Sequence, residues 1–207
     1  MLKIPFEIEP LEASALTVYL QRLKQICADM DAAYARAARR YGFSCDGCRD
    51  NCCRTRFSHH TLIEYLYLKE GLMTLSPDLQ DQVTSRAISV NDTIAKARGN
   101  PAATRLMCPL NVDTRCILYP YRPMICRLHG IPHELQKPGQ PPIMGPGCGT
   151  FDSRCGQQPY VPFDRTPVYQ DMAKIEQALR QATGFEGRMR MTVSEMILNF
   201  YYEIYRY

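Results

Sequence analysis

The stretch from residue 99 to 163 places the strongest constraint on how this chain can fold. It holds 11 of the 15 prolines, 7 of the 12 glycines and 5 of the 10 cysteines. Proline and glycine interrupt regular structure, and no helical period survives here. Loops of this length are unusual inside a compact domain, so the stretch needs another source of order. Metal ligation by the cysteines is the simplest candidate.

A long amphipathic helix is expected near the N-terminus. Between Leu16 and Tyr41 apolar residues recur at alternating spacings of four and three, and Gly42 follows as a helix stop. A helix of about 30 residues is about 45 Å long. Its apolar face therefore needs other helices of the chain or a second subunit. A homodimer through this helix is one hypothesis, and packing within the chain is the other.

Caps and apolar periods predict shorter helices elsewhere, and no alternating run is long enough for a strand. The predicted helix starts are Ser58, Ser76 with Pro77, Pro167, and Thr192 with its capping-box partner Glu195. The fold class is therefore mainly α, a helical scaffold around an irregular metal-binding region rich in proline, glycine and cysteine. We expect one domain over residues 1–207, divided into the long helix (1–42), the cysteine-cluster region with two helices (43–163) and a C-terminal helical pair (164–207).

Composition excludes several classes of protein. A hydrophobic fraction of 45% and a charged fraction of 22% are typical of a soluble globular chain. No apolar run approaches the roughly 18 residues of a membrane span, and Pro5 interrupts the place of a signal peptide, so we expect no membrane association and a cytoplasmic location. A net charge of +4 over 207 residues is too weak to indicate nucleic acid. In a reducing compartment, patterned cysteines favour metal over disulfides.

The first cysteine cluster follows the long helix directly. Its spacing is C-x2-C-x3-C-C, formed by Cys45, Cys48, Cys52 and Cys53. Three thiolates so close together are typical of iron–sulfur loops and less usual in zinc modules. Neighbouring side chains diverge, so the vicinal pair indicates either two nearby metals or one ligand beside a core residue.

The second cluster lies in the proline-rich stretch. Its cysteines are separated by 8, 10 and 22 residues, so each would be delivered by its own turn: Cys108, Cys116, Cys126 and Cys148. Proline or glycine beside the first and last of them supplies the backbone that such turns need. Together the two clusters give eight candidate ligands, enough for two four-cysteine sites or for one site with spare thiols.

The combined pattern resembles the YkgJ-like cysteine-cluster family, described as a zinc- or iron-chelating domain. The pattern runs from Cys45 to Cys148 and includes Tyr119, Arg122 and Pro123 between Cys116 and Cys126. The same motif occurs in flagellin lysine methylases, for which the resemblance implies an iron–sulfur cluster. For this chain the resemblance implies metal binding.

Two cysteines fall outside the pattern. Cys27 occupies the apolar face of the long helix, where a free thiol behaves as a small core residue. Cys155 follows Cys148 by seven residues, and the sequence leaves open whether it is a ligand or a loop thiol.

Histidines are weaker ligand candidates. His59 and His60 fall in the first turn of the helix expected after Ser58, where surface exposure is the default. His129 follows Cys126 by three residues and could replace a thiolate, whereas His133 is interpreted as an ordinary loop residue.

Arg122 and Arg127 flank Cys126 and are candidate cofactor-binding residues. A thiolate-ligated cluster is negatively charged, so nearby guanidinium groups would stabilise it and raise its reduction potential, or would bind an anionic substrate beside it. The alternative is that both hydrogen-bond to loop carbonyls and acidic side chains.

Three functional classes remain. The favoured one is a metalloprotein that binds an iron–sulfur cluster, expected to be 4Fe–4S, for redox or metal-dependent chemistry with an unknown protein or small-molecule partner. The second is a structural zinc protein with two four-cysteine sites whose helices bind a partner. The third is a methyltransferase related to the flagellin enzymes, although the chain has no glycine-rich nucleotide loop. The sequence does not decide whether the protein is an enzyme.

Overall fold

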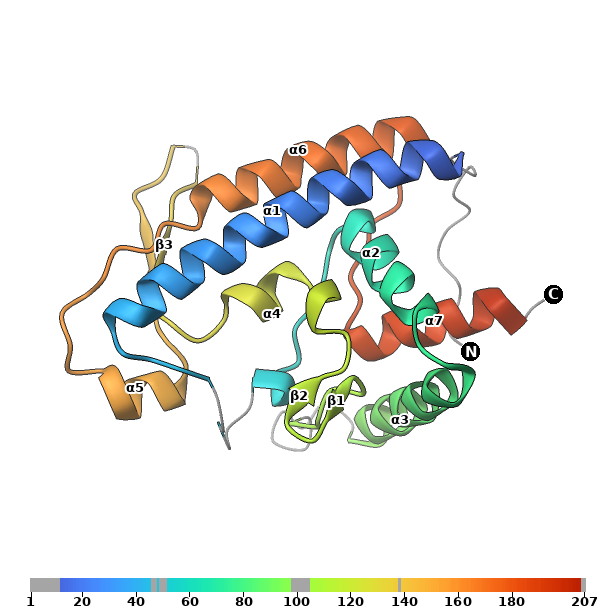
Figure 1. The fold of residues 1–207 in the computed structure, drawn as a ribbon, viewed down its shortest axis with the longest axis horizontal. Coiled ribbons are helices and arrows are strands. Elements are labelled where there is room, and N and C mark those ends of the chain that lie inside the picture. The colour runs from blue at the N-terminus through green and yellow to red at the C-terminus, as the bar shows by residue number, and fades with distance from the viewer. Residues whose placement is uncertain (1–11, 46–47, 49–51, 98–104, 138, 206–207) are drawn as a thin grey trace. The chain divides into compact units, whose positions relative to one another are not determined.

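The computed structural model describes residues 12–45, 48, 52–97, 105–137 and 139–205, with some side chains left out, that of Cys52 among them. In this part the chain is mainly α-helical, as predicted, with seven α-helices and two short two-stranded sheets (Figure 1). None of the described helices has the length and apolar character that crossing a membrane requires.

The chain forms two compact units, which are described separately. Unit 1 includes Cys53–Pro123 and Leu179–Tyr207, and unit 2 includes Glu12–Cys52 and Met124–Ala178. The boundary between the units passes between the vicinal cysteines, so Cys52 belongs to unit 2 and Cys53 to unit 1.

The long predicted helix is α1 (Ala13–Arg40) in unit 2, and it packs against the short helix α4 (Met124–Leu128). Its apolar face is buried within the chain, and Leu23 and Met30 are almost inaccessible to solvent. The helix stops at Gly42, whose φ of +61° suits glycine at this position, as the sequence predicts.

A second long helix of the fold is α6 (Thr166–Thr183). Its first part lies beside α1 in unit 2 (Figure 1), where the Tyr19 hydroxyl donates to the Ala178 carbonyl at 3.4 Å. The sequence predicts its start, because Pro167 is suited to the first turn of a helix.

The irregular part of unit 2 contains short elements that the sequence did not predict. Strands β3 (His133–Leu135) and β4 (Ile143–Gly145) pair antiparallel, and helix α5 (Gly149–Cys155) follows them. Glu134 of β3 also bridges Asp164 in parallel, which gives the small sheet a third chain segment. The short helices α4 and α5 carry too few residues to show a helical period, which explains why the sequence analysis missed them.

Three helices form the core of unit 1: α2 (Leu62–Met73), α3 (Pro77–Lys96) and α7 (Val193–Tyr205). Helix α7 packs against both of the others. Two predicted caps are confirmed, because the Ser76 hydroxyl accepts from the Leu79 amide and Thr192 forms a reciprocal capping box with Glu195.

The predicted start of α2 at Ser58 is wrong by three residues. The cap is Thr61, whose hydroxyl accepts from the Glu64 amide at 3.4 Å. Residues before it are held extended, because His59 exchanges two backbone hydrogen bonds with Met191, at 2.7 and 3.0 Å. This long-range bridge also buries His59, which the sequence analysis expected at the surface.

The irregular part of unit 1 follows α3. It consists of a two-stranded hairpin, β1 (Asn111–Val112) with β2 (Arg115–Cys116), and of the 3-10 turn η3 (Tyr119–Tyr121). The turn packs closely on α2, because a Cβ atom at Gly71 would lie 2.6 Å from the Tyr121 ring.

Candidate metal centre

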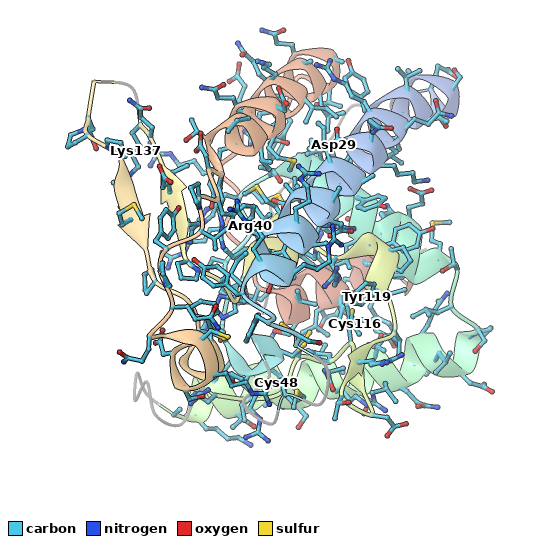
Figure 2. All side chains as sticks on the ribbon, turned by 60° about the vertical axis from the view of Figure 1, so that its left-hand side comes forward. Asp29, Arg40, Cys48, Cys116, Tyr119 and Lys137 are labelled. Carbon is cyan, nitrogen blue, oxygen red and sulfur yellow. The ribbon has the colours of Figure 1, made fainter. Side chains whose placement is uncertain are left out.

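In unit 2, the motif cysteines come from three separate segments. Cys45 and Cys48 follow α1, Cys126 lies within α4, and Cys148 is the N-cap of α5. Figure 2 labels Cys48 from this group. The side chain of Cys52, which by chain position belongs to the same unit, lies outside the described part.

Cys48 and Cys148 meet at the start of α5. The Cys48 Sγ lies 3.2 Å from the Thr150 hydroxyl, two residues beyond Cys148. The Cys148 Sγ accepts a hydrogen bond from the Phe151 backbone N–H at 3.4 Å. Backbone hydrogen bonds to sulfur also surround metal-bound thiolates in proteins, where they tune the centre.

Cys45 and the end of α4 are connected through Tyr34 of α1. The Tyr34 hydroxyl lies 3.6 Å from the Cys45 Sγ. The same hydroxyl approaches Gly130 so closely that a Cβ atom there would be 2.6 Å from it. The Gly130 carbonyl in turn accepts from the Cys148 amide at 3.0 Å. These contacts draw the segments of all four described motif cysteines of unit 2 into one neighbourhood.

In unit 1, the hairpin carries two thiols to a third. Cys108 lies just before β1, and Cys116 ends β2, where it pairs with Asn111 (Cys116 is labelled in Figure 2). The Cys108 amide donates to the Cys53 carbonyl at 2.8 Å, although 55 residues separate the two in sequence. Asp113 and Thr114 both have positive φ, the geometry of the tight hairpin turn that sets this register.

The three thiols of unit 1 interact electrostatically. The pKa of Cys108 is raised to about 12, mainly by burial and in part by the Cys53 and Cys116 thiols, although a hydrogen bond from the Leu110 backbone acts in the opposite direction. At neutral pH the Cys108 thiol is therefore protonated in the metal-free chain, and a bound metal ion would replace that proton.

Asn111 tests whether these residues fit a metal–sulfur centre. Its side-chain Nδ2 is buried and has no hydrogen-bond partner, which costs about 1–3 kcal/mol for a buried donor. Asn111 stands opposite Cys116 in the hairpin, and its backbone N–H donates to the Cys108 carbonyl at 2.9 Å. A metal-bound thiolate or cluster sulfide beside Asn111 would accept this orphan N–H, so the residues of unit 1 fit such a centre.

The cysteines outside the motif occupy the core. Cys27 is buried on the inner face of α1, as expected. Cys155 is also buried, and its Sγ donates to the Tyr41 carbonyl at 3.6 Å. This contact favours a packing role for the thiol whose role the sequence left open.

Arg122 and Arg127 have different surroundings. The Arg122 guanidinium stacks 3.5 Å above the Tyr119 ring, and its Nε donates to the Tyr119 carbonyl at 3.1 Å. Arg127 is buried and pairs with Asp31 of α1 at 2.5 Å. Both contacts match the alternative that the sequence left open, in which these arginines bind loop carbonyls and acidic side chains.

Two histidines have a lowered pKa, and burial is the largest cause for each. Burial lowers the pKa of His59 to about 4, assisted by the neighbouring charge of His60. Burial also lowers the pKa of His133 to about 4, with a further contribution from Arg165. Both imidazoles are therefore neutral at pH 7. His129, the candidate replacement ligand, lies just after α4 and is partly exposed.

Among the described residues, no group of three or more His, Cys, Asp or Glu side chains is arranged to hold a metal ion. In that part of the chain, the thiols share neighbourhoods without forming a closed ligand set. Thiolate sites commonly complete their folding only when the metal binds.

Comparison with known proteins adds no assignment. No family model, no curated protein and no solved structure matches this chain.

Three residues at the candidate centre were missed by the sequence analysis: Tyr34, Asn111 and Arg165. Tyr34 and Arg165 reach the cysteine segments only through long-range contacts, which leave no local pattern. Asn111 could have been singled out from the sequence, because it lies between Cys108 and Cys116, within the hairpin that joins them.

Proposed function

We propose that this chain is a metalloprotein that binds an iron–sulfur cluster through cysteine thiolates. Two observations carry the proposal: Cys53, Cys108 and Cys116 gather in unit 1, and Asn111, opposite Cys116 in the hairpin, has a buried side-chain amide without an acceptor. A metal–sulfur centre explains both the grouping of thiols and the orphan N–H, whereas an ordinary apolar core explains neither.

In this proposal, each unit has its own ligands. Cys45, Cys48, Cys126 and Cys148 would hold a cluster in unit 2, where four thiolates match the usual ligand set of a 4Fe–4S cluster. Unit 1 would hold a second metal centre through three thiolates, a number that leaves a coordination position for a substrate or an outside ligand. Such centres supply electron transfer or Lewis-acid activation.

Structural zinc is the second candidate. Four cysteines in unit 2 also match a closed tetrahedral zinc site. Two four-cysteine zinc sites are less favoured, because only Cys53, Cys108 and Cys116 of the motif belong to unit 1.

Anaerobic purification followed by metal analysis and visible spectroscopy tests the proposal. We expect a brown protein with broad visible absorbance and with iron and acid-labile sulfide in equal amounts. A colourless protein with bound zinc would replace the iron–sulfur proposal with the zinc candidate. A protein that takes up neither metal, even after anaerobic reconstitution, would contradict both. Anaerobic handling matters because zinc displaces iron when clusters decay in air.

Cys27→Ala provides the matched control for ligand substitutions. Cys45→Ser, Cys48→Ser and Cys126→Ser are expected to lose metal, whereas Cys27→Ala keeps its full metal content because Cys27 is a buried core residue. Equal metal content in all four variants would refute the ligand assignment.

A further inference from the structure

Unit 2 contains a buried arginine that lacks an ion-pair partner. Arg165 lies immediately before α6, and only 3% of its surface is exposed. In the part of the chain that the structure describes, no carboxylate forms an ion pair with it, and its Nε has no hydrogen-bond partner. Arg127, a second buried arginine among the described residues of unit 2, is paired with Asp31.

The groups around Arg165 are neutral. Its guanidinium donates to the Leu128 carbonyl, is hydrogen-bonded to the Tyr169 side chain, and lies 5.4 Å from the centre of the Phe163 ring. Tyr34, Tyr160 and His133 interact with it electrostatically, but tyrosine hydroxyls are neutral at pH 7, and so is His133.

Arg165 nevertheless keeps its charge. Burial lowers its pKa to about 10, while Tyr169 and Tyr34 act in the opposite direction, so the guanidinium remains protonated at neutral pH. A buried charge without an anionic partner is strongly unfavourable. One of these neighbours contacts a carboxylate, because the Tyr160 hydroxyl donates to Glu134 at 2.8 Å. The Glu134 carboxylate therefore contacts a neighbour of the guanidinium and forms no ion pair with Arg165 itself.

The contacts of Arg165 lead to the cysteine segments of unit 2. Leu128, whose carbonyl accepts from the guanidinium, ends α4 two residues after Cys126. Tyr34, which interacts with Arg165, reaches the Cys45 Sγ with its hydroxyl at 3.6 Å. Arg165 is therefore linked to Cys45 through Tyr34, and to the segment of Cys126 through Leu128.

We propose that Arg165 is the countercharge of the thiolate centre of unit 2, acting through Tyr34 on Cys45 and through the end of α4 on Cys126. This inference rests on the proposed metal-binding function. A centre with four thiolates carries net negative charge whether it holds zinc or a cluster. The buried guanidinium stabilises that charge, favours metal uptake and raises the reduction potential of a cluster. Arg165 is a positioning and electrostatic residue and not a metal ligand.

Anaerobic Co²⁺ titration tests the countercharge, because bound thiolates give Co²⁺ an intense visible band. Arg165→Met removes the charge and keeps an unbranched side chain, and is expected to weaken Co²⁺ binding about tenfold, because the bound thiolates lose a partly screened countercharge. Arg165→Lys keeps the charge and is expected to stay within about threefold of the wild-type affinity. The titration is then repeated with the Arg165 variants in a Cys116→Ser background, which removes a thiol of unit 1. An effect of Arg165→Met that persists in this background belongs to unit 2.

Arg180→Met is the matched control. Arg180 lies on the same helix, donates to the Gly187 carbonyl at 2.8 Å and stacks 4.7 Å from the Phe185 ring. It therefore shares the chemistry of Arg165 but belongs to unit 1. Its loss is expected to lower the melting temperature equally with and without metal, and to leave Co²⁺ affinity in unit 2 unchanged.

The melting temperature supplies an independent readout that a purely structural role would not produce. Arg165→Met is expected to shrink the rise in melting temperature that metal causes, while the metal-free protein melts no lower than wild type. If Arg165→Met lowers the melting temperatures of the metal-free and metal-bound forms equally and leaves Co²⁺ affinity unchanged, the inference fails although the proposed function stands. If Arg165→Met destabilises the metal-free protein and the added substitution Glu134→Gln restores its stability, Arg165 is the countercharge of Glu134 and the inference also fails. If wild type binds no metal, both fail.

Discussion

The two units present their cysteines in different ways. In unit 1, Cys108 and Cys116 flank a hairpin whose tight turn is set by local backbone geometry. In unit 2, the thiols come from the loop after α1, from α4 and from the start of α5, and only long-range contacts draw these segments together. Local geometry therefore sets the spacing of Cys108 and Cys116, whereas the thiols of unit 2 depend on long-range contacts, and under the proposed function they would depend more on a bound metal for their order.

The units also differ in ligand number and in surrounding charge. Unit 1 contributes three motif cysteines and an orphan amide donor, while unit 2 contributes four described motif cysteines and a buried arginine. Each unit therefore has a buried polar group whose requirement is not fully met: the Asn111 amide lacks an acceptor, and the Arg165 guanidinium lacks an ion-pair partner among the described residues. Under the proposed function, these differences predict two separate metal centres, an open one in unit 1 and a closed one in unit 2.

Substitution of one ligand in each group gives the largest expected effect. Cys126→Ser is expected to lose the metal of unit 2 and keep that of unit 1, and Cys108→Ser is expected to do the reverse. Loss of the unit 2 metal should be the more destabilising, by about 3 kcal/mol or more, because structural metal binding contributes directly to folding. Metal analysis of both variants measures which metal is lost, and thermal melting measures the loss of stability. Loss of all metal from either single variant would break the comparison by indicating one shared centre.

The next effect is a difference in acid sensitivity between the units. His59 of unit 1 is buried and its pKa is lowered from 6.5 to about 4. As pH falls from about 6.5 to about 4, the unfolded chain binds a proton and folded His59 does not, so stability present above pH 6.5 decreases by up to about 3 kcal/mol. His59→Phe should flatten this dependence in urea unfolding between pH 7 and pH 4.

His133→Gln serves as the matched variant in unit 2. Burial lowers the pKa of His133 to about 4 as well, but this side chain is only half-buried, so solvent screens the effect and the expected change is smaller. An equally steep loss of stability in His59→Phe and wild type would show that burial of His59 does not set the acid sensitivity of unit 1.

The smallest predicted effect concerns the orphan amide of unit 1. Asn111→Leu removes the buried donor without a partner, so the metal-free protein should gain about 1 kcal/mol while metal binding weakens severalfold. Urea unfolding of the metal-free form and competition with a chelator measure the two quantities. Destabilisation of the metal-free protein together with unchanged metal affinity would show that the amide is only part of the fold.

The sequence predicted those parts of the fold that depend on local signals. The stop of α1 at Gly42, the Ser76 cap and the Thr192–Glu195 capping box are confirmed, since each is encoded within a few residues. The start of α2 was misplaced because the bridge between His59 and Met191 joins residues far apart in the chain. Helices α4 and α5 were missed because five and seven residues are too few to show a period.

For the candidate centre, the sequence predicts the cysteine ligands but not the residues that surround them. Cysteine spacing is a local pattern, and it remains the basis of the ligand predictions. The division of the motif between two units follows from tertiary contacts, as does the approach of Tyr34 to Cys45. The isolation of Arg165 from carboxylates depends on the burial of its whole neighbourhood, which no short segment encodes.

X-ray absorption spectroscopy of the anaerobically purified protein tests the central claim most directly, because it reports which atoms surround the bound metal. The account predicts an iron edge with a first shell of sulfur at about 2.3 Å, together with a second shell of iron at the short separation of a cluster. A zinc edge with four sulfurs would retain the thiolate centre and replace the cluster. A first shell of oxygen and nitrogen would contradict the claim that the cysteines of this chain bind the metal.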